Sequence, residues 1–473
     1  MGAPVKHSPK AIATAAAMVV LAAWLPLQAN AQTVVTAPAG GLQTAPPVNT
    51  LIGWASLPAA TFSPGPVSGQ FVGTGPFNQV HVPPFPGQPV QGFSAILDGP
   101  VAGTFYLMSD NGFGNRANSA DALLRVYAAR IDGATRSLQP VHFTTGAARA
   151  SFDADTFITL HDPQRLLGYP IVADRTHYRD GSTIVVDPTI REQRLLTGAD
   201  LDPESIRRDR DGNFWFGEEF GPFVVQTDAT GRVLAREFTL PGVVSPDSPY
   251  VGPDAPANLP RSRGFEGMAL SHDGSRLLTM LEGTVAGDPP GTVRINEFDL
   301  ASRAYTSFQA LYRMDPAAAA IGDFTVVDER RFLVIERDGG QGPDARFKRV
   351  FLADLGARDA DGFVAKTEVA DLMNIADPDD LNGDGSTTFT FPFVTIESVL
   401  LVDERTLLIT NDNNFPFSNG RTPGTADNNE FMLLQLTQPV PEPEAWAMLL
   451  AGLGLTGWAV RRRRAAAAKA TGT

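Results

Sequence analysis

Acidic residues recur at matching positions in several segments of this chain. Four segments share the pattern: LDPESIRRDRDGNFWFGEEFG (201–221), FEGMALSHDGSRLLTMLEG (265–283), GDFTVVDERRFLVIERDGG (322–340) and IESVLLVDERTLLITNDNN (396–414). Each has an opening acid, a short apolar run, a tight acidic turn and a second apolar run that ends in acids. An earlier segment, GFSAILDGPVAGTFYLMSDNG (92–112), matches in its second half but opens with Ser94.

If these segments surround one axis, their acids converge on it. The opening acids would form one ring, of Glu204, Glu266, Asp323 and Glu397. The closing acids would form another, of Asp110, Glu218 or Glu219, Glu282, Glu336 or Asp338, and Asp412. Converging carboxylates repel one another unless cations or arginines lie among them. Oxygen ligands alone favour Ca²⁺ before Mg²⁺. The alternative is that these acids cap strands or pair with nearby arginines.

The elements that must position these acids are short strands. From about residue 51 onward the chain is dense in Gly and Pro, and no long helical period appears. Repeated pairs of strands joined by tight turns indicate an all-β protein built as a β-propeller of four-stranded blades. Units of about 60 residues predict six or seven blades, one of them through Asp155 to Val186. A large β-sandwich is the alternative.

A second calcium candidate lies outside the repeats. Asp380, Asn382 and Asp384, followed by Gly385, match the opening of an EF-hand loop. Phe391 stands where that loop needs a bidentate Glu, so a solvated acidic turn is the alternative.

Other catalytic patterns are missing from the sequence. It has no G-x-S-x-G motif, no H-E-x-x-H motif, no P-loop and no cysteine. His161 and His177 could act as acid or base, although lone histidines are more often structural. Arg175 and Arg179 could bind an anion that bound cations also hold.

Both ends of the chain have the composition of addressing segments. A charged start, an apolar stretch and Ala29-Asn30-Ala31 predict a signal peptide over residues 1–31, followed by a flexible leader over 32–50. After the expected propeller domain (51–438), residues 439–464 hold Val-Pro-Glu-Pro, an apolar run over 445–460 and four arginines. This order resembles the PEP-CTERM sorting signal, which implies processing by an exosortase. An ordinary C-terminal membrane anchor is the alternative.

These segments predict where the protein resides. We expect transient insertion into the inner membrane through residues 445–460, a cytoplasmic tail over 465–473, and delivery to the cell surface or extracellular matrix. The body carries no cysteine, so an exported protein of this kind has no disulfides to stabilise it. The formal charge of −14 argues against nucleic acid as a partner. We expect a monomer.

Three stretches of the body resemble a known family. They are GFSAI…FYLMSDNGFG (92–114), DPESIRRDRDGNFWFGEEFGPFV (202–224) and RGFEGMALSHDGSRLLTMLEG (263–283). Over about residues 52–436 the chain is similar to the esterase-like activity of phytase family of secreted bacterial propellers. The resemblance implies hydrolysis of phosphate or other esters with Ca²⁺ as cofactor. Glu204, Glu219 and Glu266 would hold the ions, and Arg175, Arg179 or Arg263 would hold an anionic ester substrate.

Two other functions fit the sequence. A surface propeller without activity could bind exopolysaccharide or a partner protein, with platforms from Phe391, Phe393, Phe415 and Phe417. A gluconolactonase-like lactonase is the other, because its blades share the Asp-Gly-Asn-x-Trp turn found at 211–215. The small number of lysines argues against inositol hexakisphosphate itself as the substrate.

Overall fold

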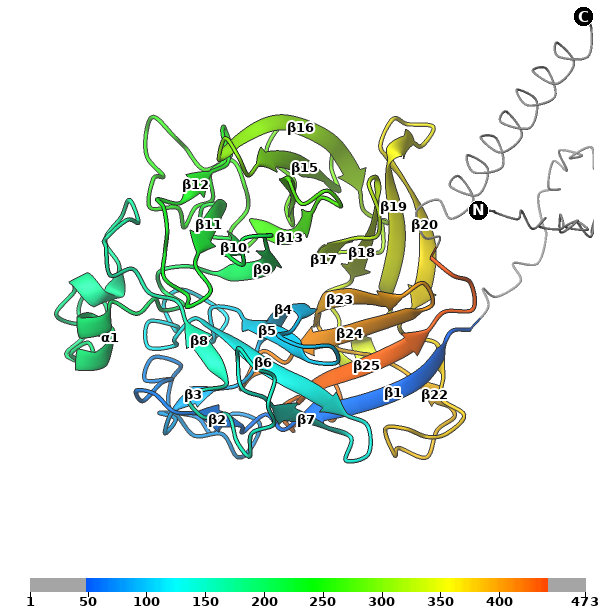
Figure 1. The fold of residues 1–473 in the computed structure, drawn as a ribbon, viewed down its shortest axis with the longest axis horizontal. Coiled ribbons are helices and arrows are strands. Elements are labelled where there is room, and N and C mark those ends of the chain that lie inside the picture. Colours follow the sequence, from blue (N-terminus) through cyan, green and yellow to red (C-terminus); the bar gives the residue numbers. More distant parts are fainter. Residues whose placement is uncertain (1–47, 441–473) are drawn as a thin grey trace, which may run out of the picture. The chain divides into compact units, whose positions relative to one another are not determined.

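The computed structural model describes residues 48–440, which form five blades of four strands arranged around a centre (Figure 1). Three of the blades are separate four-stranded sheets, and the other two are parts of one larger sheet. The prediction of an all-β propeller is confirmed. Blade I contains β4 (Phe93–Asp98), β5 (Phe105–Ser109), β6 (Arg125–Asp132) and β7 (Ser137–Pro140). Blade II contains β9 (Pro203–Arg208), β10 (Phe214–Glu218), β11 (Phe223–Thr227) and β12 (Phe238–Thr239). Blade III contains β13 (Phe265–Leu270), β14 (Arg276–Leu281), β15 (Thr292–Asp299) and β16 (Ala304–Arg313).

The last two blades follow the same plan, and the first strand of the domain closes the ring. Blade IV contains β17 (Ala320–Val326), β18 (Arg331–Arg337), β19 (Lys348–Arg358) and β20 (Val364–Asp371). Blade V contains β23 (Thr395–Asp403), β24 (Thr406–Asp412), β25 (Asn429–Gln435) and β1 (Thr50–Leu57). Because β1 pairs with β25 from Thr50–Gln435 to Leu57–Asn429, the two ends of the domain are hydrogen-bonded into one sheet.

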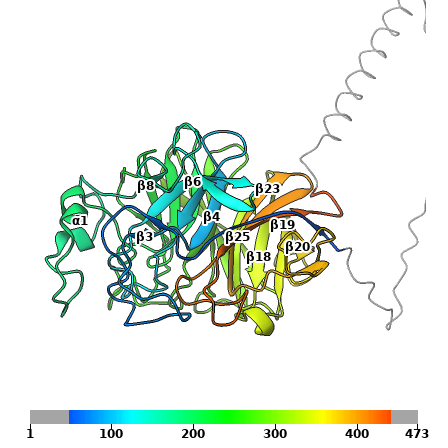
Figure 2. The ribbon, with the colours of Figure 1, turned by 90° about the horizontal axis from the view of Figure 1, so that it is seen from below.

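The propeller has five blades among the described residues, fewer than the six or seven that the repeat length predicted. Its inner strands β4, β9, β13, β17 and β23 each contact the next, and β23 contacts β4 again (Figure 1). The segment expected to form another blade contains only β8 (Phe157–Thr159), which pairs with β6, and the short helices η1 (Val172–Asp174) and α1 (Pro188–Gln193). This segment is an excursion that projects from one side of the ring (Figure 2).

Four short strands and one short helix lie in the remaining loops. They are β2 (Phe62–Ser63), β3 (Gln88–Pro89), β21 (Ile375–Ala376), β22 (Thr388–Phe389) and η2 (Gly342–Asp344). None of the helices between residues 48 and 440 is long and apolar enough to cross a membrane. The expected signal peptide, nearly all of the leader, the apolar run at 445–460 and the tail lie outside the described residues.

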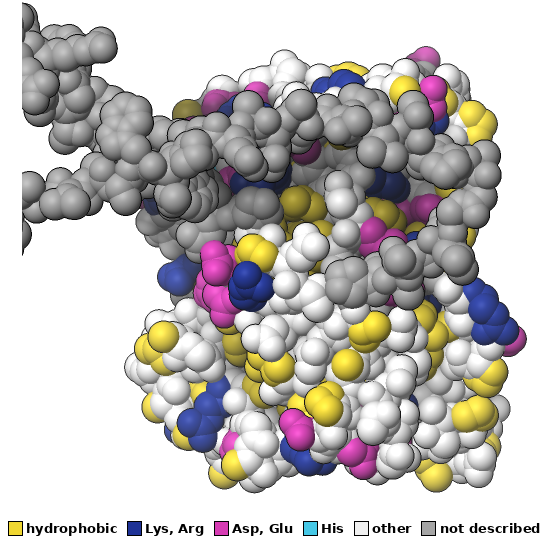
Figure 3. Space-filling view, turned by 90° about the vertical axis from the view of Figure 1, so that its right-hand side faces the viewer, with side chains coloured by type: hydrophobic (Ala, Val, Ile, Leu, Met, Phe, Trp, Pro, Cys, Tyr) yellow, Lys and Arg dark blue, Asp and Glu magenta, His cyan; other side chains and the backbone are white. Residues whose placement is uncertain are grey.

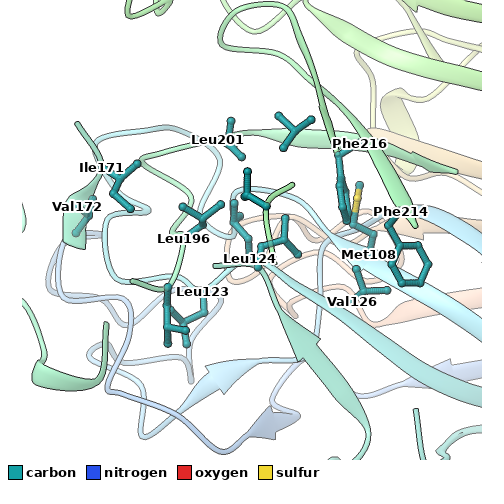
Figure 4. Close-up of a cluster of buried hydrophobic side chains, with 14 of the residues drawn as sticks. Met108, Leu123, Leu124, Val126, Ile171, Val172, Leu196, Leu201, Phe214 and Phe216 are labelled. Carbon is teal, nitrogen blue, oxygen red and sulfur yellow. The ribbon is translucent and has the colours of Figure 1, made fainter. Parts of the chain in front are cut away.

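A separate apolar cluster fills each of the five interfaces between blades. Phe214 and Phe216 of blade II pack with Met108, Leu124 and Val126 of blade I, and the excursion adds Ile171 and Leu196 to this cluster (Figure 4). The other clusters join blades II and III, III and IV, IV and V, and V and I. Burial of alternate strand residues against a neighbouring sheet therefore fixes the angular position of every blade.

Trp215 occupies the interface between blades II and III. It is 1% exposed, packs on Phe298 of blade III, and donates its indole N–H to Asp209 at 2.8 Å. We expect Trp215→Ala to lower the free energy of unfolding by about 3–5 kcal/mol, because it removes a large buried side chain and leaves a cavity. Denaturant unfolding measures this loss, and a change below about 1 kcal/mol would show that the interface does not limit stability.

The visible part of the side that bears β19 and β20 carries side chains of several kinds (Figure 3). On the face that bears β19 and β20, hydrophobic, basic and acidic groups are interspersed among the described residues (Figure 3). The charge pattern that marks a site is found instead at the centre of the ring.

Candidate functional site

Each inner strand carries a β-bulge at the same place. The register of its pairing with the second strand shifts at that point in all five blades. The residues at the bulges are Ser94, Glu204, Glu266, Gly322 and Glu397. A bulge re-aims a side chain relative to the regular alternation of a strand. The opening ring therefore has three of its four predicted acids.

Asp323 was predicted for this ring, but it lies one residue beyond the bulge of blade IV. It pairs with Arg207 at 3.4 Å and accepts the backbone N–H of Val399 at 2.9 Å. The bulge position itself is Gly322, where a Cβ would lie 1.9 Å from the carbonyl oxygen of Ile396. Close approach of blades IV and V thus excludes any side chain from this position.

The second ring is formed by the residues that end the second strands. In each second strand, one residue pairs with the inner-strand residue that directly precedes the bulge. The ring consists of the residues that follow this one in sequence: Asp110, Glu219, Glu282, Arg337 and Asp412. Four of the predicted acids are present. In blade IV, where either Glu336 or Asp338 was expected, the residue in phase is Arg337, which lies between them.

Arg337 binds three carboxylates of the two rings. Its Nη2 lies 3.0 Å from Glu397, 3.2 Å from Glu282 and 3.4 Å from Glu266. Burial lowers the pKa of Arg337, but Glu397, Glu282 and Glu266 raise it more, so the guanidinium stays charged. Arg263 forms an ion pair with the other oxygen of Glu282. Blade IV therefore supplies a cation where the other four blades supply acids.

Asp202 is a member of the cluster that the sequence analysis missed. It precedes β9 and stands two residues before Glu204. Its Oδ1 is buried and has no hydrogen-bond partner within residues 48–440. Carboxylate oxygens of Asp202, Glu204 and Glu219 lie within 4.8 Å of one another, and those of Glu219, Glu266 and Glu282 do as well. Glu219 is common to both groups.

The cluster carries far more acid than base. Eight buried carboxylates share the centre with the guanidiniums of Arg337 and Arg263: Asp110, Asp202, Glu204, Glu219, Glu266, Glu282, Glu397 and Asp412. Burial first, and then neighbouring carboxylates, raise the pKa of Asp110, Glu204, Glu219 and Glu266 well above the ordinary range. The pKa of Glu397 rises to about 8, chiefly through burial, despite the opposing effect of Arg337.

These carboxylates fit a hard divalent cation. All the donors are oxygens of Asp and Glu, they are held by rigid strand ends, and their charges exceed those of the arginines. The two overlapping groups of three offer places for two cations that share Glu219. Without cations, protons must neutralise several of these groups at neutral pH.

This requirement predicts how stability depends on pH. The pKa of Glu397 is 4.5 when unperturbed and about 8 in the folded state, so the unfolded chain holds fewer protons between these values. Stability therefore falls as pH rises through that window. In EDTA we expect the Tm to decrease from pH 5 to pH 8, and added Ca²⁺ should flatten this slope. An equal slope with and without Ca²⁺ would contradict the assignment of the cluster as a cation site.

Several predicted ligands lie outside the cluster. Glu218 accepts the backbone N–H groups of Phe220 and Gly221 at 2.8 and 2.7 Å, and thereby closes a turn. Glu336 binds Tyr312 and Lys366, and Asp338 pairs with Lys348 at 2.9 Å. These three acids therefore cap a turn or pair with basic side chains, as the alternative reading of the sequence expected, and they do not belong to either ring.

The loop at 380–385 is a turn that is held by hydrogen bonds between its own residues. Asp380 accepts the N–H of Gly385 at 3.0 Å, and the amide of Asn382 donates to Asp384 at 2.9 Å. A calcium ion would require the Asn382 oxygen, and the site stays a prediction.

The predicted histidines and aromatic loops also lie apart from the cluster. His161 bonds the carbonyl of Thr159 through Nδ1 at 3.0 Å, and His177 lies in an exposed bridge to Val185. Phe391, Phe393 and Phe415 are at most 1% exposed. These three rings are core residues, so they cannot be the expected platforms for a polysaccharide.

The predicted arginines separate into two places. Arg263 is in the cluster through Glu282, whereas Arg175 and Arg179 line a cavity beside it.

The family described as "Phytase-like: Esterase-like activity of phytase" matches residues 88–415, a span that contains all eight carboxylates. The chain belongs to this family. The PEP-CTERM protein-sorting motif matches residues 439–464, so the chain has an export and surface-sorting signal.

More distant similarities accompany this phytase-like assignment. An "Uncharacterized secreted protein" of Arthroderma benhamiae is 24% identical over 184 residues, which are 31% of this chain and 36% of that relative. An exo-beta-1,3-galactanase from Phanerochaete chrysosporium has a TM-score of 0.37 at 10% identity, over 73% of this chain and 61% of that one. A luciferin-regenerating enzyme has a TM-score of 0.34 at 11% identity, over 73% and 79%.

Proposed function

We propose that this phytase-like propeller is an exported, surface-sorted hydrolase of phosphate or other esters that depends on Ca²⁺. The observation that supports the proposal is the excess of buried carboxylates at the centre of the ring, with two groups of three that share Glu219. A purely structural centre would not need this many acids, because each one costs stability when it is buried without a partner.

Residues of blades II and III would form the metal site. Asp202 and Glu204 would hold one cation and Glu266 and Glu282 another, with Glu219 between them. Divalent cations bound there would neutralise ester oxygens and lower the pKa of a coordinated water.

The chain's own groups would keep these ligands in place. The backbone N–H of Gly264 donates to Glu219 at 3.0 Å, and Ser94 donates to Glu397 at 3.0 Å. Arg337 would bridge Glu266 and Glu282 and offset their mutual repulsion, because its Nη2 contacts one oxygen of each. Arg263 is 37% exposed at its side chain and could contact an anionic ester as well as Glu282.

Hydrolysis assays test this proposal directly. The purified protein would be given p-nitrophenyl phosphate, bis-p-nitrophenyl phosphate, phytate and p-nitrophenyl acetate, each with Ca²⁺ and with EDTA. We expect turnover of at least one ester that EDTA abolishes and Ca²⁺ restores. Absence of turnover for all four, with a Tm that still depends on Ca²⁺, would instead support a binding propeller whose ions are structural.

The location of the proposed reaction follows from the sorting motif. Processing by an exosortase at residues 439–464 would deliver the propeller to the cell surface or the extracellular matrix. A substrate there would be an anionic ester that the cell does not need to import.

A further inference from the structure

An arginine-lined cavity lies beside the carboxylate cluster. Its volume is about 580 Å³, and Arg116, Arg175, Arg179 and Arg261 contribute to its walls. The aromatic rings of Tyr178 and Phe220 line the same space. It is formed by the excursion together with loops of blades I and II.

Two of these arginines form no salt bridge with a carboxylate among the described residues, although Arg116 interacts electrostatically with Asp200. Arg116 donates to the backbone carbonyls of Ala199 at 2.8 Å and Asp247 at 3.0 Å. Arg179 donates to the carbonyl of Ala117 at 3.2 Å and lies over the ring of Phe71. Both guanidiniums therefore donate to backbone carbonyls rather than to a carboxylate.

The other two arginines are only partly neutralised. Arg175 lies 3.5 Å from Asp180, whose side chain is fully exposed, so solvent screens that pair. Arg261 pairs with Asp247. The remaining acid of the cavity, Asp200, accepts backbone N–H groups from Val172 at 2.7 Å and Thr197 at 2.9 Å. In a chain of net charge −14, this cavity is locally positive.

The cavity and the carboxylate cluster share three stretches of backbone. Asp200 lines the cavity two residues before Asp202, and Phe220 follows Glu219 directly. Ser262 also lines the cavity and precedes Arg263, which pairs with Glu282. A molecule in the cavity would therefore adjoin the proposed metal site.

From this arrangement we infer that the cavity binds a phosphate-class oxyanion, carried by the substrate as a second anionic group apart from the ester that is cleaved. The claim that the substrate carries this anion rests on the proposed function, whereas the claim that the cavity binds phosphate does not. The planar fork of a guanidinium matches phosphate oxygens in pairs, and four such forks in one cavity favour a dianion.

Binding of inorganic phosphate tests the cavity without any reaction. Calorimetric titration in EDTA would compare the unmodified protein with Arg175→Ala, Arg179→Ala and the double variant. Arg191→Ala is the matched control, because this arginine is exposed on α1 of the same excursion and lies outside the cavity. We expect the Kd to rise about tenfold or more in the double variant and to stay unchanged in the control. No saturable binding, or equal binding by all four proteins, would overturn the inference.

A second arm separates this inference from the proposed function. With Glu219→Gln, phosphate binding in EDTA should persist even though hydrolysis is lost. If the unmodified protein hydrolyses esters, Arg179→Ala should raise the KM for a bisphosphorylated ester while kcat and the kinetics for p-nitrophenyl acetate stay within twofold. An equal loss for both substrates would contradict a role in binding the second anionic group. Phosphate binding without any turnover would leave the cavity assigned and would refute the hydrolase.

Discussion

Replacement of Glu219 by Gln is expected to lower the rate of ester hydrolysis about 100-fold or more and to weaken Ca²⁺ binding. Glu219 is the only residue that belongs to both groups of three carboxylates found in the described part of the chain, so its loss affects both proposed cation positions. Replacement of the carboxylate by a neutral amide also removes a negative charge that would attract a divalent cation. Steady-state kinetics at saturating Ca²⁺ would measure the change.

Glu192→Gln provides the matched control for this variant. Glu192 is exposed on α1, and the same chemical change there should leave both hydrolysis and Ca²⁺ affinity unaltered. Because burial and Glu282 raise the pKa of Glu219, the amide should be tolerated in the metal-free fold, and the Tm in EDTA should not fall. Unchanged turnover in Glu219→Gln, with the fold intact, would remove this residue from the reaction.

Replacement of Arg337 by Met is expected to lower the free energy of unfolding as much as Trp215→Ala does. It would leave Glu266, Glu282 and Glu397 without their shared guanidinium, and loss of one partner from a buried ion pair costs about 3–5 kcal/mol. Denaturant unfolding in EDTA at pH 7 would measure the loss. Arg276→Met is the control, because the side chain of Arg276 is 42% exposed and its pair with Glu297 should contribute less than about 1 kcal/mol.

Compensation within the cluster distinguishes electrostatics from packing. Adding Glu397→Gln to Arg337→Met removes one unpaired charge and should recover part of the lost stability, and a lower pH or added Ca²⁺ should do the same. If Arg337→Met were no more destabilising than Arg276→Met, the carboxylates could not depend on Arg337 for neutralisation.

The repeat made much of this centre predictable. Glu204, Glu266 and Glu397 were aligned by their place before a strand, and Asp110, Glu219, Glu282 and Asp412 by their place after one. The structure puts all seven at equivalent positions of their blades. A repeated pattern translates into a ring because every blade offers the same strand to the same axis.

Other features depend on contacts that a pattern cannot show. Asp323 looks like a ring acid, but the bulge falls on Gly322, since blades IV and V approach too closely for a side chain there. The blade count was too high because the segment from Asp155 to Val186 packs on blades I and II instead of forming a sheet. Arg175 and Arg179 were predicted to bind an anion, but Asp202 and the cavity residues Arg116 and Arg261 were missed, because they lie in loops for which the repeat gives no alignment.

Titration of Ca²⁺ into the metal-free protein tests the central claim most directly. Calorimetry at pH 7 should show saturable binding of Ca²⁺ with release of protons, because cations would displace the protons that the buried carboxylates hold. The same titration of Glu219→Gln should show this binding abolished or greatly weakened, while Glu192→Gln should match the unmodified protein. Equal heats for all three proteins, or no binding at all, would contradict the assignment of the central carboxylates as a cation site.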